Sequence, residues 1–559
     1  MLLECRALSE SRPRHILVAV AWPYANGSLH LGHMAGAYLP ADIFARYHRM
    51  AGNRVLMVSG SDQHGTPVTV RADNEGTTPQ AIVDRFHPEF LRYWQELGIS
   101  FDLFTTTGTD NHREVVHDFF LTLHRKGHIY KATTQQFFDT QVGRFLPDRY
   151  VEGSCPFCGY EKARGDQCDN CGRTLDPEQL INPRSRLTGA SPEMRPTDHF
   201  FFRLTSFRDQ LLEWLRSRKG WRRHVQAYSI GVCEEGLIDR AITRDMEWGV
   251  PLPVEDLGRG KRIYVWFEAF IGYVSAAKEW AQRNGTPDAW RDWWDDDRGG
   301  ETYYFIGKDN IFFHTIFWPA VLMGYGGLNL PTNVPANQYV LFRGAKASKS
   351  EGVGESVLSY LERYQPDAIR YGLAANLPET SDTDLTEAEL VRRNNEELVA
   401  TWGNLVNRVL SMTARNFDGA IPQPGELSDR DRALIERASA TLAEVAQHIE
   451  AVRLKAGLAS AMATAQEANA YLNETEPWKT VKTDRERAAT SLFVAISVIE
   501  ALKIALYPYI PFSSRAVHRF LGHADEIEDQ GWTARPPKPG ARLGQITPLF
   551  PKIEVAAAE

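Results

Sequence analysis

Two histidines spaced three residues apart, His30 and His33, occur in the segment AWPYANGSLHLGHM at residues 21–34. An apolar run at 15–20 predicts a buried strand just before them, and the residues that follow predict a helix. The first turn of a helix offers backbone N–H groups and a positive dipole end, which favour a bound phosphate. Gly32 lets the backbone approach a flat ring such as adenine. The segment predicts a nucleotide site; the alternative is that one histidine caps or packs and the other is solvated.

A lysine-bearing loop, KASKS at 346–350, is the second candidate for phosphate chemistry. Lys346 and Lys349 on a glycine-flanked loop can neutralise the charge that builds on a pyrophosphate leaving group in a transition state. A short lysine and serine run is more often a solvated loop. The loop therefore indicates a phosphate site only together with the histidine pair.

Four cysteines form a C-x2-C pair, a spacer of nine residues and a second C-x2-C pair: Cys155, Cys158, Cys168 and Cys171. Four thiolates make a closed tetrahedral site, which predicts one structural Zn²⁺. An iron–sulfur centre or redox disulfides are the alternatives. Cys5 and Cys233 remain as unassigned thiols.

These candidate sites need a scaffold, and the apolar runs predict a parallel sheet. The run at 15–20 and a second run that begins after Gly52-Asn53 flank a helical pattern at Leu39, Ile43 and Tyr47, which is a β-α-β unit. Pro40 should kink this helix or end its first segment. We expect later strands of the same sheet at 262–274 and 302–313.

The chain of 559 residues is long enough for about three or four structural units. Residues 125–240 interrupt the alternation of predicted strands and helices, which predicts an insertion. Alanine-rich helical patterns from 429 to about 505 predict a helical bundle. The expected divisions are two halves of the parallel-sheet domain at 1–124 and 241–342, the insertion at 125–240, a loop region at 343–395 and a helical region at 396–559.

Composition and charge narrow the classes of protein. The formal net charge of −8 argues against a protein that coats nucleic acid through bulk charge, so any such binding is local. No run of 18 apolar residues is present, and the first 14 residues lack the features of a signal peptide. We expect a cytoplasmic protein that does not span a membrane.

In this order, HLGH and KASKS resemble the signature pair of class I aminoacyl-tRNA synthetases. The resemblance extends to PYANGSLHLGHM, SDQHGTP, YVWFEAFIGY and FIGKDNIFFHTIFWPA, which look like the methionyl-tRNA synthetase family over most of the first 400 residues. NETEPWK extends it into the bundle. The resemblance implies a Rossmann-like catalytic domain with a zinc-binding connective insertion, followed by an α-helical anticodon-binding domain.

The implied reaction joins methionine to ATP as methionyl-adenylate and then transfers methionine to the 3′ end of tRNA(Met), including the initiator tRNA. The substrate carboxylate is the nucleophile, so catalysis is mostly positioning and charge stabilisation. ATP, with Mg²⁺, is expected at the following residues: His30, Gly32, His33, Arg244, Gly307, Lys308, Asp309, Lys346 and Lys349. Asp309 could instead be a helix N-cap.

The same resemblance implies a methionine pocket. Asp62 would hold the substrate ammonium, while Tyr24 and His314 would read the sulfur, and an aromatic contact to sulfur contributes about 0.3–1.5 kcal/mol. Each aromatic taken singly is more often simple core. The expected lining is Ala21, Trp22, Tyr24, Asp62, Trp266, Ala269, Tyr273, Phe313, His314 and Trp318.

Three residues depart from the family pattern. Glu268 stands where the pattern has an aspartate, and Phe270 replaces a proline, so the pocket wall should be reshaped. Ala347 replaces the usual methionine of the loop, which removes an apolar anchor but keeps both lysines.

The bundle would read the anticodon. Trp478 matches a tryptophan that stacks on an anticodon base, worth about 1–3 kcal/mol, and Asn404 and Arg408 match polar readers. The alternative for Trp478 is a packing residue. No further tRNA-binding module follows the bundle, so we expect a monomer.

Two other functions are alternatives to this ligase. A nucleotidyl-transferring relative without tRNA is disfavoured by the bundle and the cysteine cluster. A non-catalytic tRNA-binding homologue is disfavoured because both histidines and both lysines are intact. An insertion of roughly 110 residues is small for the hydrolytic editing domain that discriminates between aliphatic side chains.

Overall fold

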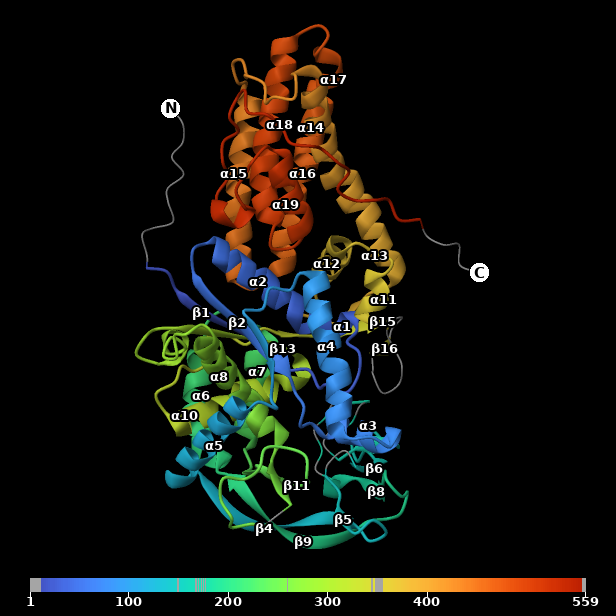
Figure 1. The fold of residues 1–559 in the computed structure, drawn as a ribbon, viewed down its shortest axis with the longest axis vertical. Coiled ribbons are helices and arrows are strands. Elements are labelled where there is room, and N and C mark those ends of the chain that lie inside the picture. The colour runs from blue at the N-terminus through green and yellow to red at the C-terminus, as the bar shows by residue number, and fades with distance from the viewer. Residues whose placement is uncertain are drawn as a thin grey trace.

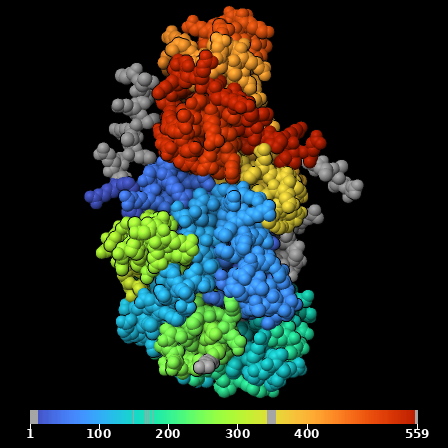
Figure 2. Space-filling view, in the orientation of Figure 1, coloured from blue at the N-terminus to red at the C-terminus, as the bar shows by residue number. Residues whose placement is uncertain are grey.

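The structure is a computed structural model that describes residues 12–147, 150–165, 168, 170–171, 173, 175, 177–258, 260–342, 345–346 and 355–554, with the backbone alone at 342 and 345–346. A helical bundle occupies one end of the molecule, the parallel sheet lies in the middle, and antiparallel strands form the opposite end (Figure 1). The bundle sits directly on the first part of the chain, which is blue in Figure 2.

The central sheet has five parallel strands in the order β14-β13-β1-β2-β3. Alternate residues of β1 enter two different hydrophobic clusters, with Ile16, Val18 and Val20 on one face and Leu17 and Ala19 on the other. This burial on both faces confirms the predicted parallel sheet. The strands are β1 (His15–Val20), β2 (Arg54–Ser61), β3 (Leu103–Thr106), β13 (Glu301–Gly307) and β14 (Ala336–Asn337).

Helices cover both faces of this sheet. The cluster around Ile16 contains α2 (Leu39–Met50), α3 (Thr66–Glu75), α4 (Pro79–Leu97) and α12 (Pro366–Ala375). The cluster around Leu17 contains α5 (Asp110–Arg125), α6 (Arg208–Ser217), α7 (Arg223–Glu235), α8 (Val265–Arg283), α9 (Arg291–Trp294) and α10 (Trp318–Tyr325). The domain is therefore doubly wound.

The helix after β1 changes its winding, as Pro40 predicts. It begins as α1 (Leu31–His33), passes through a π-helical turn η1 (Met34–Tyr38) and becomes regular α2 at Leu39. Pro40 lies in the first turn of α2 and has no N–H to donate to the preceding turn, where the carbonyl of Gly36 accepts from the side chain of Asn337 at 2.8 Å instead.

The predicted strand at 262–274 is wrong. Only β12 (Lys261–Ile263) is a strand, and it pairs with β11 (Thr243–Asp245) outside the central sheet, whereas the rest begins α8. α8 is buried on nearly every side, so its apolar run has no polar face that would mark a helix. The prediction at 302–313 holds for β13, after which the chain turns through η5 (Lys308–Asn310) and η6 (Phe313–Phe317).

The inserted segment forms sheets of its own. β4 (Ile129–Asp139) and β9 (Glu193–Phe202) pair along their lengths in an antiparallel sheet completed by β5 (Arg144–Phe145) and β10 (Arg240–Ala241). A smaller antiparallel sheet, β7-β6-β8, carries the cysteine region. Its strands are β6 (Val151–Ser154), β7 (Ala163–Arg164) and β8 (Ile181–Ser185).

A third small sheet connects the central domain to the bundle. β15 (Val340–Phe342) pairs with β16 (Ala345–Lys346) and with β17 (Thr383–Asp384). Helices α11 (Val357–Leu361) and α12 precede β17 in sequence, and α13 (Glu387–Arg393) follows it. The π-helical segment η7 (Asn394–Gly403) then leads into the bundle.

The predicted bundle is confirmed. It contains α14 (Asn404–Asn416), α15 (Asp429–Glu450), α16 (Leu454–Thr475), α17 (Pro477–Thr480), α18 (Arg485–Leu506) and α19 (Pro511–Phe520). Among the described residues, α18 is the one helix whose length and composition would suit a membrane span, but 89% of its apolar window is buried inside the protein. It is the core helix of the bundle.

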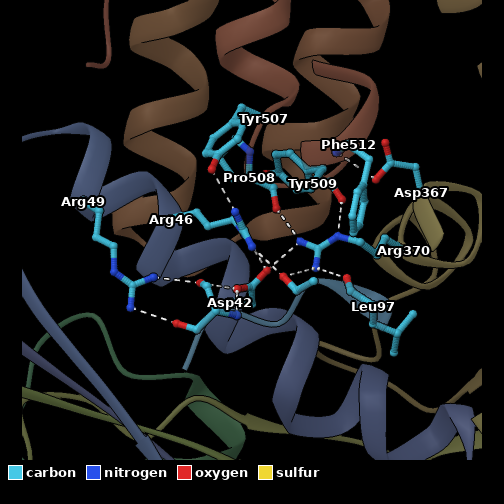
Figure 3. Close-up of polar contacts among 12 residues, drawn as sticks. Asp42, Arg46, Arg49, Leu97, Asp367, Arg370, Tyr507, Pro508, Tyr509 and Phe512 are labelled. Atoms are coloured by element: carbon cyan, nitrogen blue, oxygen red, sulfur yellow. Dashed lines mark hydrogen bonds and ion pairs between the residues drawn. The ribbon is translucent and has the colours of Figure 1, made fainter. Parts of the chain in front are cut away.

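A buried polar network joins the bundle to the central domain (Figure 3). The carboxylate of Asp42 on α2 accepts from Arg46 at 2.8 Å and from Arg370 at 2.7 Å, and Arg370 also donates to the carbonyls of Pro508 and Tyr509 beyond α18. Burial alone would raise the pKa of Asp42, but the two guanidinium groups hold it below its usual range. The helix that starts at His30 is thus fixed against the bundle.

Candidate active site

Three segments that carry candidate site residues follow the carboxyl ends of neighbouring strands. Residues 21–24 follow β1, residues 62–65 follow β2 and residues 308–310 follow β13. Their backbones continue the sheet pairing, because Ala21 N–H donates to the carbonyl of Phe305 at 3.1 Å and Asp62 N–H donates to the carbonyl of Pro23 at 2.9 Å. Ligands of open parallel sheets bind at this edge.

A cavity at this edge brings most of the expected methionine residues together. Phe313 and Trp318 do not line it: Phe313 stacks on Trp266 with ring centroids 4.2 Å apart, and Trp318 is buried against Phe270. Asn310 is a lining residue that the sequence analysis missed. The lining comprises Ala21, Trp22, Tyr24, Asp62, Trp266, Ala269, Phe270, Tyr273, Asn310 and His314.

Asp62 is the one carboxylate in this lining. It is 3% exposed, and its Oδ1 accepts the backbone N–H of His64 at 3.2 Å. Burial, followed by the charge of Glu268, raises the pKa of Asp62 well above its usual range, and the N–H groups of His64 and Gly65 only partly offset this. Such a site favours a cationic partner, which would restore the ionised carboxylate.

His314 and Tyr273 form a fixed pair in the cavity wall. His314 Nδ1 donates to the carbonyl of Asn310 at 3.0 Å, so its Nε2 accepts from the Tyr273 hydroxyl at 2.9 Å. Burial lowers the pKa of His314 to about 4, so the ring is neutral near pH 7. With both nitrogens engaged, His314 presents its ring surface to the cavity rather than a hydrogen-bond donor.

His30 and His33 lie together where the helix begins, with ring centroids 3.8 Å apart. The backbone N–H of His30 donates to Nδ1 of His33 at 3.3 Å, which places the proton of a neutral His33 ring on Nε2. The capping role weighed from the sequence is therefore present.

The lysine loop lies only partly within the described residues. Ala347 and Lys349 are outside them, and Lys346 is described by its backbone in β16. On the far side of the loop, His30 and Ser356 form a bridge, and Val357 N–H donates to the carbonyl of Leu29 at 3.0 Å. The flank of the loop therefore reaches the histidine pair.

The expected ribose contacts follow β13. Gly307 caps η5, so Asp309 is not its N-cap. Lys308 pairs with Asp382 at 2.8 Å and lies 3.8 Å from the ring centre of Tyr339, whose hydroxyl bonds to Asp309. These contacts tie the ribose candidates to the strand that leads into the lysine loop.

Arg244 lies in β11, and its guanidinium stacks over Tyr264 at 3.8 Å. It also donates to the carbonyls of Ala241 and Thr243. Tyr264 is two residues before Trp266, which places Arg244 near the cavity wall.

The four cysteine sulfurs converge. All lie within 4.8 Å of one another, with 3.9 Å between Cys155 and Cys171 and 3.6 Å between Cys158 and Cys168. Four sulfurs about 2.3 Å from one tetrahedral Zn²⁺ lie about 3.8 Å apart, so the spacing fits a metal and is too long for a disulfide. An Asn170 hydrogen bond helps lower the pKa of Cys158 to about 6. The cluster can hold a metal ion.

The anticodon candidates share one end of the bundle, where Figure 1 places α14 and α17 close together. The Arg408 guanidinium lies 4.8 Å from the Trp478 ring centre, and Asn404 is one turn earlier on the same helix as Arg408. Trp478 is half-buried against the core, so its ring combines packing with an accessible edge.

This fold and site define a class I aminoacyl-tRNA synthetase. Residues 16–410 match the family model of class I tRNA synthetases (M), and residues 421–555 match that of the anticodon binding domain of methionyl tRNA ligase. The chain belongs to the methionine–tRNA ligase family.

Individual relatives agree over the whole chain. It is 52% identical to a methionine–tRNA ligase of Roseiflexus castenholzii, over 97% of both chains, and 52% identical to one of Dehalococcoides mccartyi, over 97% of this chain and 98% of the relative. A structure of Mycobacterium tuberculosis methionyl-tRNA synthetase bound by methionyl-adenylate is similar with a TM-score of 0.80 and 27% identity, over 97% of this chain and all of that one. These matches favour the ligase over both alternatives weighed from the sequence.

Proposed function

We propose that the chain activates L-methionine with ATP and charges tRNA(Met), including the initiator tRNA, with the cavity beside Asp62 as the methionine site. One observation carries the assignment of the site: a buried carboxylate and a row of aromatic side chains close a cavity at the sheet edge, where the segment that leads to the histidine pair leaves β1. The Mycobacterium tuberculosis relative holds methionyl-adenylate, the product of this activation.

In the first step a methionine carboxylate oxygen bonds to the α-phosphorus of ATP, and the bond to the β-phosphate oxygen breaks to release pyrophosphate. Asp62 would hold the ammonium, while His30, His33, Lys346 and Lys349 would stabilise the phosphate charge, with Mg²⁺ bound to ATP. Gly32, Arg244, Gly307, Lys308 and Asp309 would contact the adenosine. In the second step the terminal ribose hydroxyl attacks the adenylate carbonyl and AMP leaves.

Methionine-dependent exchange of radioactive pyrophosphate into ATP tests this function. We expect exchange with methionine and none with leucine, isoleucine or valine. Aromatic rings line the cavity, and they contact a linear thioether more favourably than a branched aliphatic side chain. Exchange without any amino acid, or equal exchange with leucine, would contradict the assignment.

We propose Zn²⁺ as the ion of the cysteine cluster. Purified protein should contain about one zinc per chain by elemental analysis, and Cys158→Ser should lose most of it on dialysis against a chelator, because four-thiolate coordination is broken. Cys233→Ser is the control, since Cys233 is buried outside the cluster. Iron in place of zinc, or equal retention by both variants, would contradict the proposal.

We propose that Asn404, Arg408 and Trp478 read the anticodon. Trp478→Ala should lower the kcat/KM for tRNA charging about 10- to 100-fold, from the loss of about 1–3 kcal/mol of base stacking, while pyrophosphate exchange is unchanged.

Phe417→Ala is a matched control for Trp478. Phe417 is also a half-buried bundle ring with an arginine, Arg485, 4.8 Å from its centre. Equal losses of charging for the two variants, or loss of exchange in Trp478→Ala, would assign Trp478 to packing.

We propose that the chain acts in the cytoplasm as a monomer, with its domains divided at 124, 240, 342 and 395. The mass in solution, measured by light scattering, should be that of one chain, 63.2 kDa. A mass twice as large would contradict the monomer.

A further inference from the structure

Glu268 lies directly behind the methionine cavity and is fully buried on α8. It stands between two lining residues, Trp266 and Ala269, but its own side chain turns to two histidines. His64 Nδ1 lies 3.0 and 3.1 Å from its two oxygens, and His112 Nε2 lies 3.3 Å from one of them. One carboxylate therefore joins α8, the turn after β2 and α5.

These contacts indicate an ionised Glu268. Burial alone would raise the pKa of Glu268, but His64 and the hydrogen bond from His112 hold it below its usual range. A carboxylate only accepts hydrogen bonds, so each facing imidazole nitrogen donates a proton to it. Ser275 Oγ, 2.9 Å from Nδ1 of His112, holds the second ring in place.

His64 connects this cluster to the substrate site. Its side chain bonds to Glu268, while its backbone N–H donates to Asp62 at 3.2 Å. The next residue, Gly65, lies against the Tyr24 ring so closely that an added Cβ would be 2.1 Å from it. Fixing the His64 ring thus fixes both the carboxylate and one aromatic wall of the cavity.

Glu268 also acts on Asp62 through charge. Its negative charge disfavours ionisation of Asp62, and the two imidazoles favour the ionised form of Glu268 that carries this charge. The described titratable groups around this pair are Tyr24 in the segment after β1, Tyr38 in η1, His64 in the 62–65 turn, His112 in α5, Tyr273 in α8, Tyr304 in β13 and His314 in η6. Burial raises the pKa of Tyr38, Tyr273 and Tyr304, so these phenols stay neutral, and Glu268 is the acidic neighbour of Asp62 among these groups.

We propose that Glu268 is a positioning residue for methionine: through His64 and His112 it holds the 62–65 turn and sets the charge of the carboxylate that receives the substrate ammonium. This inference rests on the proposed function, in which Asp62 binds that ammonium.

The test measures the Kd for methionine as a function of pH, from the fluorescence of Trp22 and Trp266 in the cavity wall. Glu268→Gln keeps the size of the side chain and removes its charge, so the pH below which methionine affinity declines should move down by about one unit. His112→Leu removes one of the two donors that keep Glu268 ionised, without touching the turn, so Glu268 should lose part of its charge and that pH should move down by a smaller amount. Glu268→Asp keeps the charge and should retain the wild-type profile.

Downward shifts in both variants, larger for Glu268→Gln, support the proposal, since loss of packing would weaken binding at every pH. An upward shift in either variant, or a uniform loss of affinity, would overturn it. If His112→Leu does not fold, Ser275→Ala loosens the same imidazole and should shift the profile downward by a still smaller amount; no shift would count against the proposal.

Asp62→Asn separates this inference from the proposed function. If that variant binds methionine as tightly as the wild type, the ammonium site is wrong. If it binds weakly while Glu268→Gln keeps the wild-type profile, only the role of Glu268 is wrong.

Discussion

Asp62→Asn is expected to raise the Kd for methionine about 100-fold or more, because a buried carboxylate that pairs with an ammonium contributes about 3 kcal/mol. The amide has the same shape but no charge, so the cavity keeps its form. The KM for ATP in pyrophosphate exchange should stay near the wild-type value, since the proposed phosphate site is at His30 and His33. A tenfold change in both constants would instead indicate a distorted fold.

The same residue should make methionine binding depend on pH. Burial and the charge of Glu268 raise the pKa of Asp62, and in the proposed function the substrate ammonium binds the ionised form. As pH falls through the raised pKa, protonation competes with methionine and the Kd rises about tenfold per pH unit. Asp62→Asn should show no such slope. A wild-type Kd that is independent of pH would contradict the role of Asp62.

Local patterns were sufficient to predict the scaffold. β1, β2 and the helix between them follow from apolar runs with distinct periods, and Pro40 marks the point where the winding changes. The same reasoning failed at α8, because a helix packed between a sheet and other helices is apolar all round, like a buried strand. The periodicity of apolar residues alone cannot distinguish a fully buried helix from a buried strand.

The motifs predicted most of the residues that meet at the cavity, but not how they bond. The resemblance placed His314 and Tyr273 in one pocket, whereas their mutual hydrogen bond and the partner Asn310 emerge only from the fold. Glu268 drew notice as a departure from the family pattern, yet its partners His64 and His112 lie far away in sequence. No local spacing could connect them.

Arg370→Met should lower the free energy of unfolding by about 3–5 kcal/mol, because it leaves the buried Asp42 with one guanidinium instead of two. Arg370 is 1% exposed and donates to Asp42 and to the carbonyls of Leu97, Pro508 and Tyr509, which come from both the central domain and the bundle. Each of those carbonyls would lose a buried donor. The shift of the urea unfolding midpoint at unchanged slope measures the loss.

Arg363→Met is the matched control for this prediction. Arg363 also carries two short ion-pair contacts, to Glu355 at 2.6 Å and to Glu387 at 2.8 Å, but its side chain is 39% exposed. Solvent screens such pairs, so their loss should cost about 0–1 kcal/mol. If the two variants unfold at the same urea concentration, burial does not strengthen the Asp42 network, and the docking of the bundle on the helix of His30 depends on apolar packing instead. A large loss for Arg370→Met alone would assign that docking to the buried charges.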